Sequence, residues 1–307
     1  MAKILVLGSS GTVGRPLVKE LQRRGHDVYT SDFKHGDSPR HKRCDISEFR
    51  QIQSLFNEDF GYVYNLAAEF GRMNGEDYYE QLWKTNAIGM KNILRLQEVK
   101  RFRLIHFSSS EIYGEASLPE GDLLSEELSN KFPLRQRNDY AISKWVNELQ
   151  ILNSIAQFGT ETLTVRLFNA YGPGEYYTPY RSVVCLFIYR ALKGLPYQVF
   201  LNYKRVFMYI DNAVDTLCNI VDRFRAGQTY NIGGEEFVDV KTASDLILRY
   251  LGKDDSMVQY LPEDKHNVVS KRPDISRARR DLGHDPKIRL AEGIPKTIEW
   301  MRQAYPD

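Results

Sequence analysis

Two residues with complementary chemistry, Tyr140 and Lys144, lie four positions apart in the stretch YAISK. On a helix this spacing places both side chains on the same face. An ammonium group beside a phenol favours the phenolate, so it lowers the pKa of the tyrosine and makes it a usable general base. The spacing recurs at Tyr189 and Lys193, but the surrounding LFIYRALKG is typical of a packing helix. We therefore assign the chemistry to Tyr140 and Lys144.

A second polar group, SSSEIYG at 108–114, directly follows an apolar run that contains Leu104, Ile105 and Phe107. Hydroxyl groups and a carboxylate at the end of an apolar strand indicate that the strand ends at a polar site. Tyr140 follows this cluster along the chain and precedes a further apolar run. Strand ends of this kind hold the ligands of open α/β sheets.

Three glycines in GSSGTVG (Gly8, Gly11 and Gly14) follow the first apolar run and open a helical stretch. Such a turn lets backbone amides and the positive helix end meet a pyrophosphate. Asp32 ends the next run, where a carboxylate can accept the ribose hydroxyls of an adenosine and repel a 2′-phosphate. The sequence therefore predicts dinucleotide binding and favours NAD over NADP. Asp45 either contacts the adenine or caps the helix that begins near Glu48.

The elements that position these residues alternate between short apolar runs and amphipathic stretches. Apolar runs occur at 4–7, 28–30, 63–66, 104–107 and 163–167, and helical patterns at 16–24, 78–96 and 140–157. Continuous apolar strands indicate burial on both faces of a parallel sheet. We expect a doubly wound α/β fold. Its NAD-binding domain should span 1–167 and also take in about 205–232. Residues 168–307 should form mainly a smaller, interleaved substrate-binding region. In this second part we expect a strand at 229–232 and helices near 242–251 and 294–301.

Composition narrows the class of protein further. The chain has 307 residues, with 42 Lys and Arg against 40 Asp and Glu, so nothing suggests a nucleic-acid partner. Its longest strictly apolar run, Val183 to Tyr189, is far shorter than the roughly 20 residues of a membrane span, and we expect a cytoplasmic protein without a membrane partner. Three scattered cysteines predict neither a disulfide scaffold nor a metal site. His106 is expected to be a satisfied core residue.

Taken together, the motifs resemble the extended short-chain dehydrogenase/reductases, the family of nucleotide-sugar epimerases and dehydratases. The resemblance covers nearly the whole chain in family order. Besides the motifs above, it rests on NLAA at 65–68, TNAIG at 85–89, RLFNAYGPG at 166–174, RVFMYID at 205–211 and RPDI at 272–275.

This resemblance implies an enzyme that binds NAD and a nucleotide-diphosphate sugar. Tyr140 would be the catalytic base, Lys144 would hold the nicotinamide ribose and polarise the tyrosine, and Ser109 would hydrogen-bond the sugar hydroxyl that is oxidised. Other cofactor contacts would come from Gly8, Gly11, Thr12, Val13, Gly14, Asp32, Asp45, Ile46, Leu66, Ala67, Ala68 and Asn86. Substrate contacts would come from Ser109, Ser110, Glu111, Asn169, Arg181, Arg205 and Arg272.

The same resemblance bears on the reaction, which would oxidise the sugar at C4 and then act on the 4-keto intermediate. Glu111 matches the glutamate that dehydratases and decarboxylases use on the C5 side of the ring. Ser110 stands where glucose-type 4,6-dehydratases have an aspartate, whereas mannose-type dehydratases and glucuronate decarboxylases have serine. Lys271 stands where decarboxylases hold the substrate carboxylate with arginine, and lysine lacks the bidentate fork.

We therefore expect an NAD-dependent nucleotide-sugar epimerase. Mannose-type 4,6-dehydration and UDP-glucuronate decarboxylation are the alternatives, and a non-catalytic dinucleotide sensor is an alternative of another class. Glu69, which follows NLAA, either touches the sugar or begins a loop. Tyr176, Tyr177 and Arg181 belong to a segment that either covers the substrate or forms an interface. The long helices at 78–96 and 140–157 are expected to pair in a homodimer through a four-helix bundle.

Overall fold

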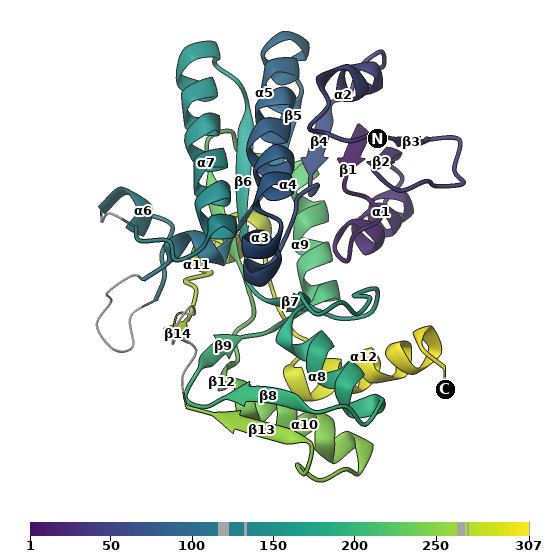
Figure 1. The fold of residues 1–307 in the computed structure, drawn as a ribbon. Helices are drawn as coiled ribbons and strands as arrows, with labels where there is room; N and C mark the ends of the chain where they lie inside the picture. The colour runs from purple at the N-terminus through teal and green to yellow at the C-terminus, as the bar shows by residue number, and fades with distance from the viewer. Residues whose placement is uncertain (116–122, 132–133, 263–267, 269, 307) are drawn as a thin grey trace.

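The core of the protein is a seven-stranded parallel sheet, seen in a computed structural model that describes residues 1–115, 123–131, 134–262, 268 and 270–306 (Figure 1). Each of its strands pairs in parallel with its neighbours. The predicted doubly wound α/β fold is confirmed. The strands are β1 (Lys3–Leu7), β2 (Asp27–Asp32), β3 (His41–Arg43), β4 (Tyr62–Asn65), β5 (Arg103–Ser109), β6 (Thr162–Leu167) and β11 (Thr229–Ile232).

The strand order in this sheet is β11-β6-β5-β4-β1-β2-β3. Chain order therefore runs outward in one direction from β1 and in the other from β4. Ligands of such sheets bind in the crevice beyond the carboxyl ends of the strands at this switch point. The turn after β1, the NLAA stretch that begins with the last residue of β4 and the serines at the end of β5 all lie at that edge.

Helices cover both faces of the sheet, because alternate residues of each strand point to opposite sides. Ile4 and Val6 of β1 pack in a core with α1 (Gly14–Arg23) and α9 (Ile210–Arg223). Leu5 and Leu7 pack in a second core with α2 (Phe49–Leu55), α5 (Gly89–Lys100) and Ile151 of α7 (Asp139–Phe158). The catalytic candidates Tyr140 and Lys144 thus lie at the start of a helix that is fixed on the sheet.

The helix expected at 78–96 is interrupted. The structure has α3 (Arg72–Asp77), α4 (Tyr79–Trp83), a π-helical turn η1 (Lys84–Ile88) and then α5. A π turn inside a helix adds one residue to the turn and often marks a functional position. Here it contains Asn86, which is buried.

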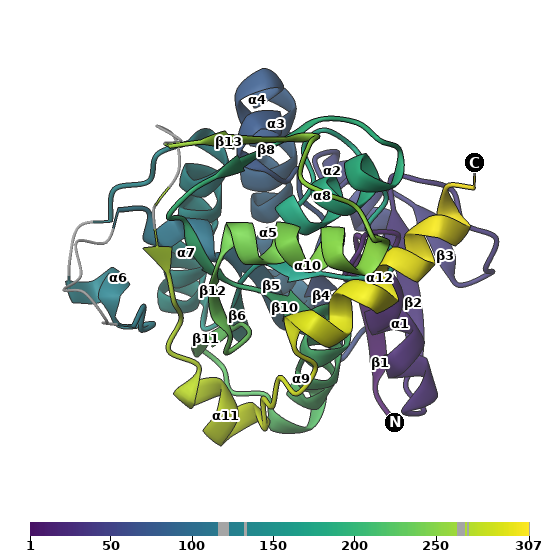
Figure 2. The ribbon, with the colours of Figure 1, turned by 90° about the horizontal axis from the view of Figure 1, so that it is seen from below.

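Most of the remaining elements, among them α8, α10 and α12, build the lower part of the molecule in Figure 1, and Figure 2 shows α10 and α12 in the view from below. Helix α9 packs on α1 beside the main sheet, and β11 pairs with β6 of that sheet. The other elements are η2 (Ser110–Tyr113), α6 (Leu128–Lys131), β7 (Ala170–Tyr171), α8 (Val183–Leu192), β8 (Tyr197–Phe200), β9 (Lys204–Val206), β10 (Met208–Tyr209), β12 (Phe237–Asp239), α10 (Val240–Leu251), β13 (Val258–Leu261), β14 (Ser270–Lys271), α11 (Ser276–Leu282) and α12 (Leu290–Ala304).

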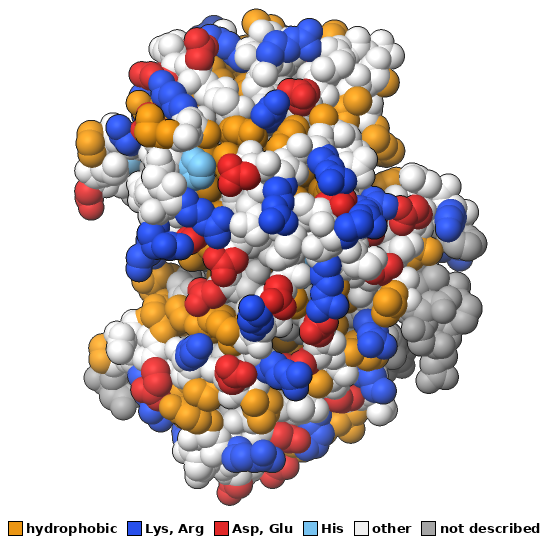
Figure 3. All heavy atoms as spheres, turned by 180° about the vertical axis from the view of Figure 1, so that it is seen from behind, with side chains coloured by type: hydrophobic (Ala, Val, Ile, Leu, Met, Phe, Trp, Pro, Cys, Tyr) orange, Lys and Arg blue, Asp and Glu red, His pale blue; other side chains and the backbone are white. Residues whose placement is uncertain are grey.

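Three small sheets organise this lower part: β10 with β7, β13 with β8, and β12-β9-β14. The last of these carries Arg205 on β9 and Lys271 on β14, whose backbones are in register. On the face shown in Figure 3, basic and acidic side chains are intermingled. No helix within the described part of the chain has the length and apolar character needed to cross a membrane.

Candidate functional site

The turn after β1 is shaped by its glycines. Gly8 has φ +77°, and a Cβ there would lie 2.6 Å from the backbone nitrogen of Ala67. The backbone of NLAA therefore lies directly against the turn. The N-terminus of α1 has no side-chain cap, which leaves its N–H groups available to an anion. Thr12 Oγ1 is buried in this turn without a hydrogen-bond partner among the described residues.

Asp32 completes this half of the site from the end of β2. It is only 7% exposed, and its two carboxylate oxygens accept hydrogen bonds from the backbone N–H groups of Ser10, at 3.0 Å, and Lys34, at 3.1 Å. These bonds fix the carboxylate beside the glycine turn and leave lone pairs for ribose hydroxyls. An uncapped helix end, an orphan hydroxyl and a fixed carboxylate are the groups that a dinucleotide needs, so the residues present fit NAD.

Two further predicted cofactor residues, Asp45 and Ile46, follow β3. Asp45 Oδ1 accepts hydrogen bonds from the backbone N–H of Ser47, at 2.9 Å, and from its hydroxyl, at 2.8 Å. Asp45 therefore stabilises the turn before α2 but does not cap this helix, whose N-cap is Glu48 and has no side-chain cap. Its contact with adenine stays a prediction. Ile46 is buried against Gly89, where a Cβ would lie 2.7 Å from the Ile46 side chain.

Asn86 joins the loop after NLAA to helix α7. Its side chain accepts the backbone N–H of Glu69 at 2.9 Å and donates to the carbonyl of Glu69 at 3.0 Å. It also donates to Ser143 Oγ at 2.9 Å, and Ser143 in turn donates to the carbonyl of Tyr140 at 2.8 Å. The π turn thus holds both the loop that begins at Glu69 and the first turn of α7.

Tyr140 itself is held where α7 begins. Asn138 caps the helix by accepting the N–H of Ala141 at 2.8 Å, and Gly75 of α3 lies against Tyr140, since a Cβ there would be 3.4 Å from the tyrosine Cβ. Burial raises the pKa of Tyr140 to about 12, with a hydrogen bond to Ser109 acting against it and the charge of Glu111 adding to it. The expected lowering of this pKa by the lysine is therefore not seen.

The position of Lys144 explains that difference. Its ammonium group lies 5.9 Å from the centroid of the Tyr140 ring and donates a hydrogen bond to the carbonyl of Phe107 at 2.9 Å. Lys144 is 4% exposed, and burial lowers its pKa to about 8 while Glu148 acts in the opposite direction. Burial is the largest cause of both shifts, and it disfavours the charged form of each group.

Ser109 and Glu111 stand at the end of β5, and Glu111 forms an ion pair with Lys271 of β14. Lys271 is 1% exposed, whereas the Glu111 side chain keeps 29% of its surface accessible. Burial opposes ionisation of Glu111, but Lys271, Arg205 and Arg72 together hold its pKa below the usual value. Positive groups from three segments that are distant in the sequence therefore lie around Glu111. The charge of this carboxylate in turn raises the pKa of Tyr140.

Several other predicted substrate residues have partners within the protein. Asn169 donates to the carbonyl of Val206 at 3.1 Å. Arg181 lies over the ring of Phe70, at 4.1 Å from its centroid, and donates to the carbonyl of Tyr176 at 3.0 Å. Arg272 lies over the ring of Phe237, and Ser110 is 3% exposed. Their roles toward a substrate stay predictions.

The alternative assignments made from sequence also have structural counterparts. Tyr189 stacks on Tyr177 with ring centroids 3.7 Å apart, and Lys193 donates to the carbonyl of Tyr305, so the second pair packs the C-terminal region. Glu69 accepts a hydrogen bond from Asn74 and begins the loop before α3. His106 is buried as expected, but neither ring nitrogen has a hydrogen-bond partner among the described residues.

Three residues in the site were absent from the predicted set: Ser143, Arg72 and Lys271. Ser143 follows from the helical spacing, because it lies three residues after Tyr140. Lys271 was weighed only as a replacement for an arginine, and Arg72, the first residue of α3, lies in a stretch of sequence without a recognised pattern. Sequence periodicity carries no signal for either, since their approach to Glu111 depends on how distant segments fold together.

The fold is that of a Rossmann-type dinucleotide-binding protein, and Ser109, Tyr140 and Lys144 lie together at the edge of its sheet. The model of the NAD dependent epimerase/dehydratase family matches residues 4–233. The chain belongs to this family, and its cofactor is accordingly NAD.

Known proteins of the same kind match along almost the whole chain. The UDP-N-acetyl-alpha-D-glucosaminuronate decarboxylase of Bacillus cytotoxicus is 28% identical over 99% of this chain and 99% of its own. The UDP-glucuronic acid decarboxylase 6 of Arabidopsis thaliana is 31% identical over 98% of this chain and 89% of its own. The structure of the Thermus thermophilus UDP-glucose 4-epimerase in complex with NAD superimposes with a TM-score of 0.87 at 24% identity, covering 99% of this chain and all of that chain.

Proposed function

We propose that the protein decarboxylates a nucleotide-diphosphate hexuronate through a 4-keto intermediate. The observation that carries this proposal is the group of three cations, Lys271, Arg205 and Arg72, around the carboxylate of Glu111 beside Tyr140. Lys271 is already paired with Glu111, so the two arginines leave an excess of positive charge there. Such an excess favours an anionic substrate, and the C6 carboxylate of a hexuronate is such a group. The two curated relatives described above, whose names denote decarboxylases of uronate sugars, support the same substrate class.

The chemistry assigns one step to each group. Tyr140 accepts the proton of the C4 hydroxyl, Ser109 holds that hydroxyl, and Lys144 stabilises the phenolate. NAD, which the glycine turn and Asp32 would hold, would supply the hydride acceptor for C4 and the donor that restores it. The 4-keto uronate is a β-keto acid, so the C5–C6 bond breaks with its electron pair moving to the C4 oxygen, and CO₂ leaves. Tyr140 returns its proton to that oxygen, and C5 takes up one proton from the cleft.

Epimerisation, which the sequence favoured, remains the second candidate because of one observation. Glu111 and Lys271 form an acid–base pair, and burial lowers the pKa of Lys271 while Glu111 opposes that effect. The hydrogen at C5 of a 4-keto sugar is acidic, so this pair can take up the C5 proton. Inversion then requires the planar enolate to turn its other face to the same pair before the proton returns. 4,6-Dehydration begins with loss of the same C5 proton, so the Glu111–Lys271 pair fits that alternative as well.

The test is to incubate the purified protein and NAD with UDP-glucuronic acid, UDP-N-acetylglucosaminuronic acid, UDP-glucose and dTDP-glucose. Products are analysed by mass spectrometry and NMR. Decarboxylation predicts the loss of CO₂ from a uronate, epimerisation predicts unchanged mass with altered ring couplings, and dehydration predicts the loss of water. A protein that converts only the neutral sugars would contradict the proposed substrate class.

A matched pair of variants tests the role of the lysine. Lys271→Met should reduce kcat/KM for the uronate by about 100-fold, because a buried charge partner of the substrate is removed. Lys241→Met is the control, since Lys241 is a surface residue that pairs with Asp245 on α10. If both variants were equally active toward the uronate, the proposal that Lys271 contributes to substrate binding would be wrong.

The predicted homodimer has a candidate surface on α5 and α7, which pack side by side (Figure 1). Several apolar side chains of η1, α5 and α7 are exposed to solvent, and a group of exposed apolar side chains is typical of an interface. A dimer predicts that Leu152→Glu yields a monomer in light scattering, while Leu195→Glu leaves the mass unchanged. The exposed apolar residues on these helices are Ile88, Val99, Leu149, Leu152 and Phe158.

A further inference from the structure

A buried ion pair lies behind the catalytic candidates. Glu148 follows Lys144 by one helical turn on α7, and Arg166 lies on β6; their side chains are 7% and 2% exposed. Arg166 Nε donates to Glu148 Oε1 at 3.1 Å, and its terminal nitrogen donates to Oε2 at 2.7 Å. This two-pronged geometry is the strongest form of an arginine–carboxylate pair.

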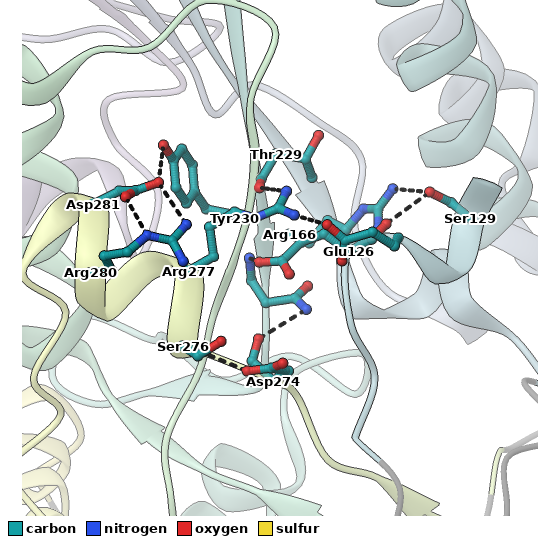
Figure 4. A network of polar contacts seen from close by, with 12 residues as sticks. Glu126, Ser129, Arg166, Thr229, Tyr230, Asp274, Ser276, Arg277, Arg280 and Asp281 are labelled. Carbon is teal, nitrogen blue, oxygen red and sulfur yellow. Dashed lines mark hydrogen bonds and ion pairs between the residues drawn. The ribbon is translucent and has the colours of Figure 1, made fainter. Parts of the chain in front are cut away.

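The remaining N–H groups of Arg166 fix it in place. They donate to the hydroxyl of Tyr113 at 2.9 Å, the carbonyl of Glu126 at 3.1 Å and Ser129 Oγ at 3.0 Å. Figure 4 shows Arg166 between Glu126 and Ser129, in a network that continues to the strand at 229–230 and to α11. With its fork held from several elements, the guanidinium keeps the Glu148 carboxylate in one orientation.

Glu148 in turn holds the end of β5. The hydroxyl of Ser108 donates to Glu148 Oε1, the same oxygen that accepts Arg166 Nε. Ser108 directly precedes Ser109, whose hydroxyl interacts with Tyr140. Glu148 therefore connects the strand that carries the sugar-facing serine with the helix that carries Tyr140 and Lys144.

Glu148 also acts on Lys144 through its charge. Burial lowers the pKa of Lys144, and Glu148 is the charged group that raises it. The elements that pack on α7 carry further ionisable groups. They include Tyr140 on α7, His106 on β5, Glu111 and Tyr113 on η2, Arg166 on β6, Arg72, Glu76 and Asp77 on α3, Glu80 on α4, Lys84 on η1, and Lys91 and Glu98 on α5.

Most of these groups have partners elsewhere. Burial, and then the charge of Lys144, lower the pKa of His106 well below its usual value, so this ring is neutral. Arg166 is engaged by Glu148 itself, Glu76 accepts the N–H of Asp139, and Glu98 accepts Ser154, ten residues farther along α7. Glu148 thus lies nearest in sequence and on the same helical face as the ammonium group that it stabilises.

We propose that Glu148, oriented by Arg166, is a positioning residue for the reaction, which keeps Lys144 charged and anchors Ser109 through Ser108. This inference rests on the proposed roles of Tyr140 and Lys144, but it does not depend on the fate of the 4-keto sugar. The Glu148 carboxylate then has two effects that can be separated by mutation. Its charge stabilises the ammonium form of Lys144, and its hydrogen bond from Ser108 holds the strand that carries Ser109.

The charge effect is tested by the pH profile of kcat/KM for Glu148→Gln. Lys144 acts as a cation, so the rate falls as pH rises through its pKa. Removing the negative charge lowers that pKa, and the alkaline limb should move down by about one pH unit, which is about a tenfold loss on that limb. The substrate is UDP-glucuronic acid, or whichever member of the panel the wild-type protein converts.

Three further variants separate this effect from lost stability. Glu148→Asp keeps the negative charge, so the alkaline limb of its kcat/KM profile should lie at the same pH as in the wild-type protein. Ser108→Ala should lower kcat by about tenfold without moving the limb, because it removes only the anchor. Glu126→Gln is the matched control, since Glu126 is a buried carboxylate of the same network that accepts the N–H of Asn231, and its limb should not move.

A Glu148→Gln protein with the wild-type profile and only a lower melting temperature would overturn the charge effect. An unchanged kcat of Ser108→Ala would overturn the anchor, even if Glu148→Gln failed to fold. Full turnover by Tyr140→Phe would instead show that the proposed function is wrong, which keeps the two failures apart.

Discussion

Helices α7 and α8 carry the same tyrosine–lysine spacing in different surroundings. On α7 the pair lies at the start of the helix, where Tyr140 meets Ser109 and Lys144 contacts the carbonyl of Phe107. On α8 the pair lies at the end, where Tyr189 stacks on an aromatic ring and Lys193 binds the carbonyl of Tyr305. Spacing alone therefore places two side chains on one face and leaves their chemistry undecided.

The difference between the helices arises from their place on the sheet. The N-terminus of α7 reaches the carboxyl end of β5, where the polar ends of several parallel strands converge. Helix α8 packs against α10, α12 and β8, away from that edge. A pair at a strand edge can meet a ligand, whereas a pair inside an aromatic cluster stabilises the fold.

Replacing each tyrosine by phenylalanine gives the largest expected contrast. Tyr140→Phe should lower kcat by about 10³-fold, because the general base is lost while the ring and its packing are kept. Tyr189→Phe keeps the stacked ring and should leave kcat unchanged. The measurement is steady-state turnover of the substrate found in the panel.

The same pair of variants has a control in cofactor binding. Tyr140→Phe is expected to retain NAD, measured as dinucleotide released on denaturation, since the glycine turn and Asp32 are untouched. Comparable losses of kcat in both variants would contradict the contrast between the helices. Loss of NAD from Tyr140→Phe would instead mean that the tyrosine supports binding rather than proton transfer.

The lysines should differ in pH dependence. The pKa of Lys144 is about 8, so its ammonium form predominates below that pH and is lost above it. We expect kcat/KM of the wild-type protein to fall as pH rises above about 8. Lys144→Met should lower kcat/KM by about 100-fold at neutral pH and abolish this limb. Lys193→Met should keep both the rate and the limb.

Much of the fold could be predicted, because apolar runs mark buried strands. The strand at 229–232 has the predicted bounds, whereas β5 extends through Ser109. The two serines were left out because they are polar, yet they pair with Arg166 and Leu167 of β6. Strand pairing, not side-chain polarity, decides where a strand ends.

The site was predictable where its residues lie close together in the sequence and less so where they do not. Lys271 is 160 residues from Glu111, and no periodicity connects them. The pKa of Tyr140 was predicted in the wrong direction, because burial of the phenol is a property of the packed protein. Asn86 was identified by its motif, but its π turn interrupts a pattern that predicts one continuous helix.

Helix capping provides the smallest and most selective contrast between α7 and α8. Asn138 accepts the N–H of Ala141 at 2.8 Å, and Ser182 accepts the N–H of Cys185 at 3.3 Å. Replacing either cap by alanine should cost about 1 kcal/mol of stability, measured by chemical denaturation. Only Asn138→Ala should also lower kcat, by about tenfold, because fraying of the first turn displaces the Tyr140 phenol from its position beside Ser109.

The two cap variants together test whether turnover depends on the local structure of α7 at the sheet edge or on the global stability of the protein. If Ser182→Ala lowered kcat as much as Asn138→Ala at equal loss of stability, then activity would follow global stability and not the geometry of one helix start. If Asn138→Ala kept full activity despite the expected destabilisation, then the sheet edge and Gly75 would suffice to hold Tyr140. The expected split, with equal stability loss and unequal turnover, places the requirement in the first turn of α7.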